Sequence, residues 1–178
     1  QLYNTPEEIA SYGEAVVSDA LIAINGHVEG IDTLGGIIQD EFGFIASFLM
    51  PLIGLALIAA LTRGEEESGR LEALLAGKID RRAPVVSAMM LVLAAVVMMD
   101  VGFVLSLLAA GIEFGPAVLY ALALGMVTVV FAALAAVCAQ VVLHSRGVFA
   151  LGFLAVGLSY VLRGVGDVNG TFWVWLSP

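Results

Sequence analysis

Four long apolar runs, separated by short polar segments, occupy most of the chain after its polar N-terminal segment. They cover residues 42–62, 84–110, 116–143 and 148–162. A helix needs about 20 apolar residues to cross the hydrocarbon core of a bilayer. The fourth run is shorter than this and ends before Arg163, but arginines at its two ends can reach the interface and lengthen the effective span. The pattern predicts an all-α integral membrane protein with four transmembrane helices.

The segment before the first run shows a different, amphipathic pattern. Residues 5–8 (TPEE) match a capping box with proline at the first helical position. Apolar side chains then recur at helical spacing at positions 9, 12, 16 and 20, and Asn25-Gly26 provides a stop signal. A second short helix is expected to begin near Asp32-Thr33 and lead into the first span. The segment is predicted to be an amphipathic helix over the outer mouth of the protein, and a solvated connector is the alternative.

Composition excludes most other classes of protein. Hydrophobic residues make up 61% of the chain and charged residues 13%, against about 45–50% and 25% in soluble domains. This composition also excludes a disordered chain, which needs low hydrophobicity. The net charge of −9, with only 7 lysines and arginines, excludes a nucleic-acid-binding protein, which needs a basic surface. No nucleic-acid partner is expected.

The basic residues predict the orientation of the chain in the membrane. Cytoplasmic loops of membrane proteins carry an excess of lysine and arginine. Six of the seven basic residues fall on one side of the predicted spans: Arg63, Arg70, Lys78, Arg81, Arg82 and Arg146. We therefore expect a multi-pass protein of a bacterial cell membrane with an extracytoplasmic helical segment, 1–41, and a transmembrane region, 42–178, that contains a cytoplasmic loop, 63–83. An outer N-terminus without a signal sequence predicts a further transmembrane segment upstream.

The cytoplasmic loop carries the most informative pattern. Glu65, Glu66 and Glu67 suit the start of a helix, Gly77 suits its end, and leucines at positions 71, 74 and 75 share one face. The residues therefore predict a short amphipathic helix along the membrane surface. A solvated loop with a few intrahelical ion pairs is equally compatible with the pattern.

The sequence of this loop resembles that of a known family. Residues 63–77, R-G-E-E-E-x-G-R-x-E-x-L-L-A-G, and the following Arg81-Arg82 are similar to the first cytoplasmic loop of type 2 ABC exporter permeases. The similarity is greatest to the actinobacterial branch that exports polyketide antibiotics and other drugs. Residues 3–8, 30–36, 162–168 and 175–178 also resemble that branch. One departure is Lys78, where relatives often carry proline.

The resemblance implies a fold, a function and a set of site residues. Such permeases have six spans per half, so this chain would supply spans two to five, and the second half would be another subunit or the remainder of the same polypeptide. The loop helix would be a coupling helix that docks on a separate dimeric ABC ATPase. Carried over to this sequence, the coupling residues are Arg63, Glu66, Glu67, Gly69, Glu72, Leu74, Leu75 and Arg81. The exporter would move hydrophobic or amphipathic small molecules out of the cell.

No enzymatic role is expected for the chain itself. It lacks the G-x-x-x-x-G-K-[ST] phosphate loop, so ATP and Mg²⁺ would bind to the partner ATPase, and this chain would hold no cofactor. The single cysteine, Cys138, excludes an internal disulfide framework and a cysteine-based metal cluster. His27 and His144 are isolated, so we expect neither a metal site nor a catalytic residue.

Asp100 is the only charge deep inside a predicted span. Charged residues at that depth are costly and are functional candidates by default. Asp100, together with the weaker candidate Thr128, is predicted to line a substrate pathway, although a protonated structural aspartate fits equally well. Two rival functions remain open at this point: a proton-coupled carrier that uses Asp100, and a membrane scaffold that transports nothing.

Overall fold

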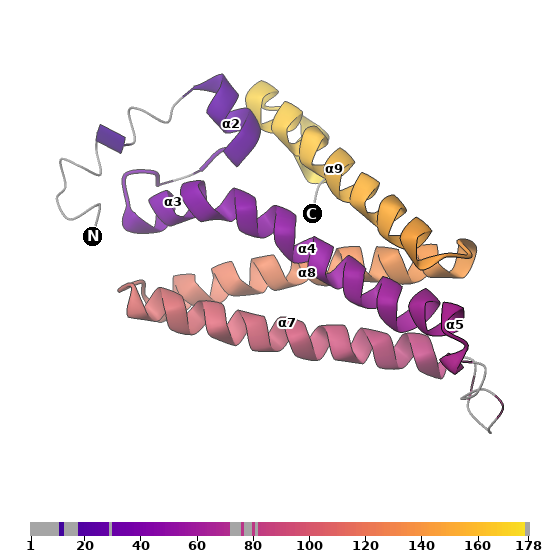
Figure 1. Cartoon of the computed structure of the whole chain (residues 1–178). Coiled ribbons are helices and arrows are strands. Elements are labelled where there is room, and N and C mark those ends of the chain that lie inside the picture. The colour runs from indigo at the N-terminus through magenta and orange to yellow at the C-terminus, as the bar shows by residue number, and fades with distance from the viewer. Residues whose placement is uncertain are drawn as a thin grey trace. The chain divides into compact units, whose positions relative to one another are not determined.

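The structure, a computed structural model, describes residues 11–12, 18–28, 30–71, 76, 80 and 82–176. No strand occurs among these residues, and their helical elements are shown in Figure 1. In chain order they are α2 (Asp19–Asn25), α3 (Leu34–Ile38), η1 (Gln39–Gly43), α4 (Phe44–Ala59), η2 (Ala60–Gly64), α5 (Glu65–Glu67), α7 (Ala83–Ala109), α8 (Phe114–Val141), α9 (Ser145–Asn169) and η3 (Phe172–Leu176).

Four helices in the described part of the chain are long and apolar enough to cross a membrane. They run over Leu34–Glu67, Ala83–Ala109, Phe114–Val141 and Ser145–Asn169. The first of them is continuous through α3, η1, α4, η2 and α5. The prediction of an all-α membrane chain with four spanning helices is confirmed.

The first membrane helix is much longer than its predicted span. Its 34 residues would extend about 50 Å at 1.5 Å per residue, whereas the hydrocarbon core of a bilayer is about 30 Å thick. The helix begins after Thr33, whose Oγ1 accepts a hydrogen bond from the Gly36 backbone N–H at 3.1 Å. This start confirms the helix expected near Asp32-Thr33. Two π-helical turns, η1 and η2, interrupt the α-helical geometry, and such turns are frequent at functional sites.

The fourth membrane helix extends beyond the apolar run of residues 148–162. It continues through Arg163 and Asp167 to Asn169. Arg163 Nε lies 3.5 Å from Asp167 Oδ2, one helical turn away. The two charges compensate each other along the helix, which is why the helix does not end at the first charged residue.

The N-terminal segment differs from the single predicted helix. Ser18 is extended, with φ −125° and ψ 143°, and its hydroxyl accepts a hydrogen bond from the Leu21 N–H as an N-cap. A helix that runs through positions 9–20 to Asn25 is therefore wrong at this point, because α2 starts anew at Asp19. The stop at Gly26 is confirmed by its φ of +86°. The predicted capping box at 5–8 lies outside the described residues.

Leu49–Val156 forms one compact unit. In it, α7 and α8 lie side by side as a hairpin (Figure 1), whose turn includes Gly111 at φ +90°. Small residues let α4 approach α8 closely. A Cβ added at Gly54 of α4 would lie 3.1 Å from the Thr128 carbonyl oxygen and 3.3 Å from the Ala132 Cβ. Close approach through small residues is the usual way in which membrane helices pack.

Gln1–Phe48 and Gly157–Pro178 form a second compact unit. Tyr160 of α9 packs its ring 5.2 Å from that of Phe44 and 6.1 Å from that of Phe48, and its hydroxyl donates to the Ile24 carbonyl oxygen. The Asp167 carboxylate accepts a hydrogen bond from the His27 backbone N–H at 3.3 Å. These contacts join α2 to the C-terminal part of α9 and to the start of α4.

Candidate functional site

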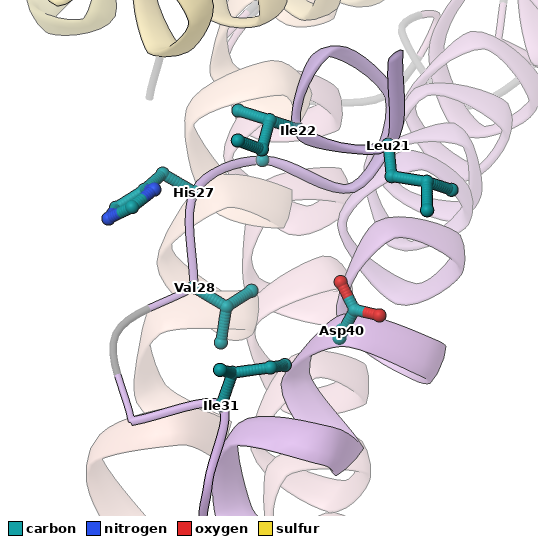
Figure 2. A pocket seen from close by; sticks show the side chains of 7 residues that line it. Leu21, Ile22, His27, Val28, Ile31 and Asp40 are labelled. Carbon is teal, nitrogen blue, oxygen red and sulfur yellow. The ribbon is translucent and has the colours of Figure 1, made fainter. Parts of the chain in front are cut away.

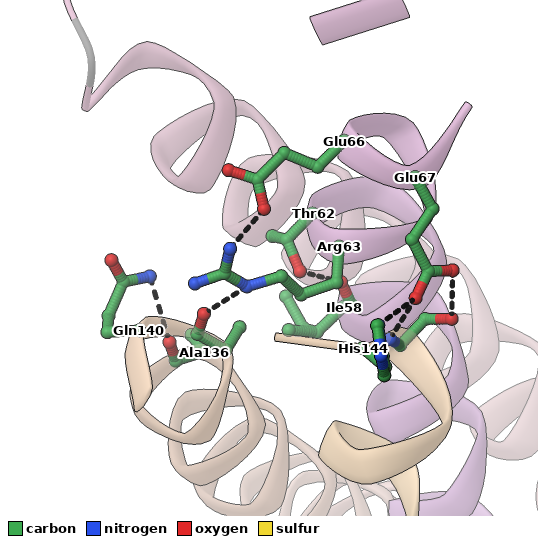
Figure 3. Close-up of polar contacts among 10 residues, drawn as sticks. Ile58, Thr62, Arg63, Glu66, Glu67, Ala136, Gln140 and His144 are labelled. Atoms are coloured by element: carbon green, nitrogen blue, oxygen red, sulfur yellow. Dashed lines mark hydrogen bonds and ion pairs between the residues drawn. The ribbon is translucent and has the colours of Figure 1, made fainter. Parts of the chain in front are cut away.

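A polar cluster lies at the end of the first membrane helix, in the unit Leu49–Val156 (Figure 3). Arg63, in the π turn η2, donates from Nε to the Ala139 carbonyl oxygen of α8 at 2.6 Å. The same guanidinium forms an ion pair with Glu66, one turn further along. Arg63 thereby ties the end of the first membrane helix to the end of α8, because it bonds both at once.

Glu67 makes the second link in this cluster. Its Oε1 accepts a hydrogen bond from the Ser145 backbone N–H at 2.9 Å, and its Oε2 accepts one from the Ser145 hydroxyl at 2.8 Å. His144 Nδ1 lies 3.5 Å from the same carboxylate. Ser145 is the first residue of α9, and a negative charge is favoured at a helix N-terminus, where backbone N–H groups are free. Glu67 therefore caps α9 from another helix.

Glu65 makes the third link, across the end of the helix. Arg70 Nε donates to Glu65 Oε2 at 2.7 Å and Arg70 Nη2 donates to Oε1 at 2.6 Å, a bidentate pair. The hydrogen bonds and negative charge of Glu65 raise the pKa of the Arg70 guanidinium above its ordinary value. Between the two residues the chain turns at Gly69, whose φ of +73° suits glycine. The pair holds this break in the helix in one geometry.

The structure corrects the predicted start of the loop helix. The sequence places the three acids at the N-terminus of a new helix, but they form the last turn of the first membrane helix, which ends at Glu67. The sequence pattern does not predict this continuation, because the end of the apolar run at residue 62 is taken as the end of the helix. Helical geometry resumes at Arg70 and Leu71, and Leu71 is only 8% exposed.

The predicted coupling residues fall into two groups. Arg63, Glu66 and Glu67 lie together in the cluster, and Gly69 lies at the break that follows it. Glu72, Leu74, Leu75 and Arg81 lie outside the described residues. The predicted docking role of all eight remains a prediction.

The two predicted pathway residues occupy different positions on the hairpin. Asp100 is half-buried on α7, with its carboxylate against Gly125 of α8, where an added Cβ would overlap it. No hydrogen bond or ion pair joins the Asp100 side chain to any residue that the structure describes. Thr128 is 2% exposed and its hydroxyl donates to the Leu124 carbonyl oxygen at 2.9 Å. Its hydroxyl is thus satisfied within its own helix, whereas the carboxylate of Asp100 is not.

Sequence reasoning misses the partners of the cluster. Ser145, His144 and the Ala139 carbonyl oxygen belong to a segment far along the chain from Glu67, and nothing in the local pattern joins the two. The one available signal is Ser145 itself, because serine before an apolar run is typical of a helix start. A metal site is not formed by any group of three histidine, cysteine, aspartate or glutamate side chains within the described residues.

The chain is similar to part of a known transport protein. The multidrug efflux system permease protein Rv1217c of Mycobacterium tuberculosis (strain ATCC 25618 / H37Rv) is 31% identical to it over 151 residues. The chain resembles a segment of an efflux permease. The match covers 81% of this chain but 28% of the relative, so the chain spans little more than a quarter of that protein's length. No protein-family model matches the chain.

The similarity and the fold agree on the setting of the protein. Four helices able to cross a membrane, together with a permease relative, place the chain in a multi-pass protein of the cell membrane. The polar cluster then lies at one end of the membrane helices, on the side that the basic residues predict to be cytoplasmic.

Proposed function

We propose that the chain is part of the permease of an ATP-driven exporter that moves hydrophobic or amphipathic small molecules, such as antibiotics, out of the cell. The observation that carries this proposal is the similarity of 81% of the chain to a multidrug efflux permease. ATP would be hydrolysed by a separate ABC ATPase dimer, because the sequence has no phosphate-binding loop of its own. A second permease half, or the remainder of the same polypeptide, would complete the pathway.

Coupling to the ATPase would pass through the segment around residues 65–76 and its flanking arginines. The polar cluster supports this role. Arg63 bonds the end of the first membrane helix to α8, and Glu67 bonds it to the start of α9. A displacement of the loop would therefore reach α8 and α9 directly, and not only the two helices that the loop connects. An open hollow of about 770 Å³ beside Glu67, His144 and Arg146 leaves this end of the helices accessible to a partner.

Two substitutions in the loop test the coupling: one reverses a charge and the other places a charge on an apolar position. We expect Glu72→Arg and Leu74→Asp to lower substrate-stimulated ATP hydrolysis by the complex about tenfold, the range of typical coupling energies. The matched control is Glu113→Arg in the α7–α8 turn, an exposed acid on the side predicted to be outside. Hydrolysis is measured after co-purification with the ATPase in lipid nanodiscs. Unchanged hydrolysis in both loop variants would remove the coupling assignment.

Asp100 is proposed to face the cargo, and Thr128, three residues after Gly125 on α8, is the weaker candidate. The carboxylate lies beside Gly125 and is not bonded to any described residue, so it is free to interact with a ligand or with a helix supplied by another part of the permease. The Tyr120 hydroxyl, also on α8, is buried without a hydrogen-bond partner among the described residues. The α7–α8 hairpin thus presents two unsatisfied polar groups, which supports a functional over a purely structural role.

The same carboxylate keeps a proton-coupled carrier as the second candidate. For the exporter we expect proteoliposomes to move drug with ATP and to show no transport with a pH gradient alone. Transport driven by the pH gradient and abolished by Asp100→Asn would instead establish the carrier. A scaffold without transport activity predicts no movement under either driving force.

A further inference from the structure

A small pocket in the N-terminal segment contains a buried acid that the proposed export mechanism does not use. The pocket has a volume of about 120 Å³ and lies wholly within one compact unit of the chain. Leu21, Ile22, Val28 and Ile31 form its apolar wall, and Asp40 supplies its carboxylate (Figure 2). The His27 ring, in contrast, is exposed and points away from Asp40 in the same view.

Asp40 is held by neutral groups only. The residue is buried, with 4% of its surface exposed. Oδ2 accepts a hydrogen bond from the Tyr12 hydroxyl at 2.7 Å, and Oδ1 accepts one from Asn25 Nδ2 at 3.1 Å. No cation contacts the carboxylate within the part of the chain that the structure describes. A carboxylate has about four acceptor positions, so two remain for a further donor, and a buried charge is normally paired.

The position of Asp40 in the backbone sets it apart from the surface acids. It lies in the π turn η1 of the first membrane helix, a geometry that often marks functional sites. The pocket is closed on the other side by α2 and the chain after Gly26, whose left-handed backbone lets the segment of residues 26–28 turn back toward Ile31. Segments from three parts of the chain therefore converge on one carboxylate.

The surrounding charge specifies the sign of the ligand. Residues 1–41 carry eight acids and no lysine or arginine. The guanidinium of Arg163 lies beside Gly26 but is paired with Asp167, so the net field of the segment attracts cations and repels anions. An inorganic ion such as Ca²⁺ needs six or more oxygen ligands, and the pocket offers one carboxylate and an apolar wall. A cation with an apolar body matches both features, because its ammonium group can donate to Asp40 while its hydrocarbon part contacts the wall.

We propose that this pocket is a binding site for a small organic cation, namely a protonated amine that carries one apolar group of about the size of a phenyl ring. An engineered closed cavity of about 150 Å³ holds benzene. This pocket, at about 120 Å³, is somewhat smaller but is open on one side, so a ring of that size can enter it in part while the rest of the ligand stays outside. The site lies in the segment predicted to be outside the membrane, and its ligand is bound without ATP or the partner ATPase. Ligand binding in this pocket can therefore be tested separately from the proposed export function.

The test compares benzylammonium with benzyl alcohol, a neutral molecule of nearly the same shape. Binding is measured by isothermal titration calorimetry on the chain in zwitterionic phosphatidylcholine nanodiscs, with the heat of titration into empty nanodiscs subtracted. We expect benzylammonium to bind at least about tenfold more tightly than benzyl alcohol. In Asp40→Asn, which keeps the shape of the side chain, that preference is expected to disappear. Asp32→Asn is the matched control: it removes the same charge from an exposed position in the same segment, and the preference should persist.

A second variant keeps the test decisive if Asp40→Asn disturbs folding. Ile31→Trp fills the pocket while it leaves the acid in place, so we expect it to weaken both ligands by tenfold or more. Equal affinity of wild type for the two ligands would overturn the proposal. So would an equal loss in Asp32→Asn and Asp40→Asn, which would indicate a diffuse acidic field, or full binding by Ile31→Trp.

Discussion

Replacement of Gly54 by leucine is expected to destabilise the packing of α4 on α8 by about 1–3 kcal/mol, the usual cost of overfilling a packed interface. The nearest atom to an added Cβ is the Thr128 carbonyl oxygen at 3.1 Å, followed by the Thr128 Cγ2 at 3.2 Å. A backbone oxygen cannot move aside as the tip of a long side chain can. The helices must therefore separate, and the apparent unfolding temperature in detergent micelles should fall.

Gly102→Leu provides the matched control for this prediction. Gly102 lies in α7, is exposed, and an added Cβ would meet nothing within 4 Å. Both substitutions replace glycine by leucine inside a helix, so both gain the same helix propensity, about 1 kcal/mol. The difference between the two variants isolates the steric term. Equal stability of the two would mean that α4 and α8 do not need to approach closely at Gly54.

Replacement of Glu67 by alanine is expected to release the start of α9 from the end of the first membrane helix. The substitution removes both acceptors that Ser145 uses and the negative charge at the N-terminus of the helix. Hydrogen exchange of the backbone amides in the first turn of α9, measured by mass spectrometry, should become faster. If displacement of the loop reaches α9 through this link, drug export by the complex should also fall by about tenfold.

Glu65→Ala controls for the loss of charge. Glu65 lies in the same helical turn and loses an ion pair of its own, but its carboxylate bonds to Arg70 in the loop and not to the start of α9. We expect the amides of α9 to exchange as in the wild type in this variant. Unchanged exchange in Glu67→Ala, or an equal increase in Glu65→Ala, would contradict the assignment of Glu67 as the residue that positions α9. Ser145→Ala, which loses one of the two bonds, should lie between them.

The membrane helices can be predicted from the sequence because their signal is local. An uninterrupted apolar run must lie in lipid, and in lipid only a helix satisfies its own backbone. The ends of the helices are harder to predict from the sequence. Arg163 marks a boundary in the apolar pattern, yet the pair with Asp167 carries α9 on to Asn169. The helix start after Thr33 can be predicted, because the Thr33 hydroxyl caps a backbone N–H only three positions away.

The candidate site can be predicted only in part, for the opposite reason. The acids at 65–67 are conspicuous in the loop sequence, and the family resemblance points to two of them, Glu66 and Glu67. The distant partners of the cluster are not, because the packing of α8 and α9 against α4 brings Ala139 to Arg63 and Ser145 to Glu67. The sequence does not distinguish Asp40 from the other acids of the segment. Its burial and its hydrogen bonds to Tyr12 and Asn25 depend on how the segment folds.

The π turns of the first membrane helix have a consequence for the direction in which its ends face. Each π turn takes in about one residue more than an α-helical turn, and one residue corresponds to a rotation of about 100° around the axis. The residues after η2 are therefore turned by about that angle relative to a helix that continues from α4 without a π turn. In this orientation Glu65 and Glu67 meet their separate partners, Arg70 and Ser145. The extra residue of the π turn therefore decides which way the side chains at the end of the helix point.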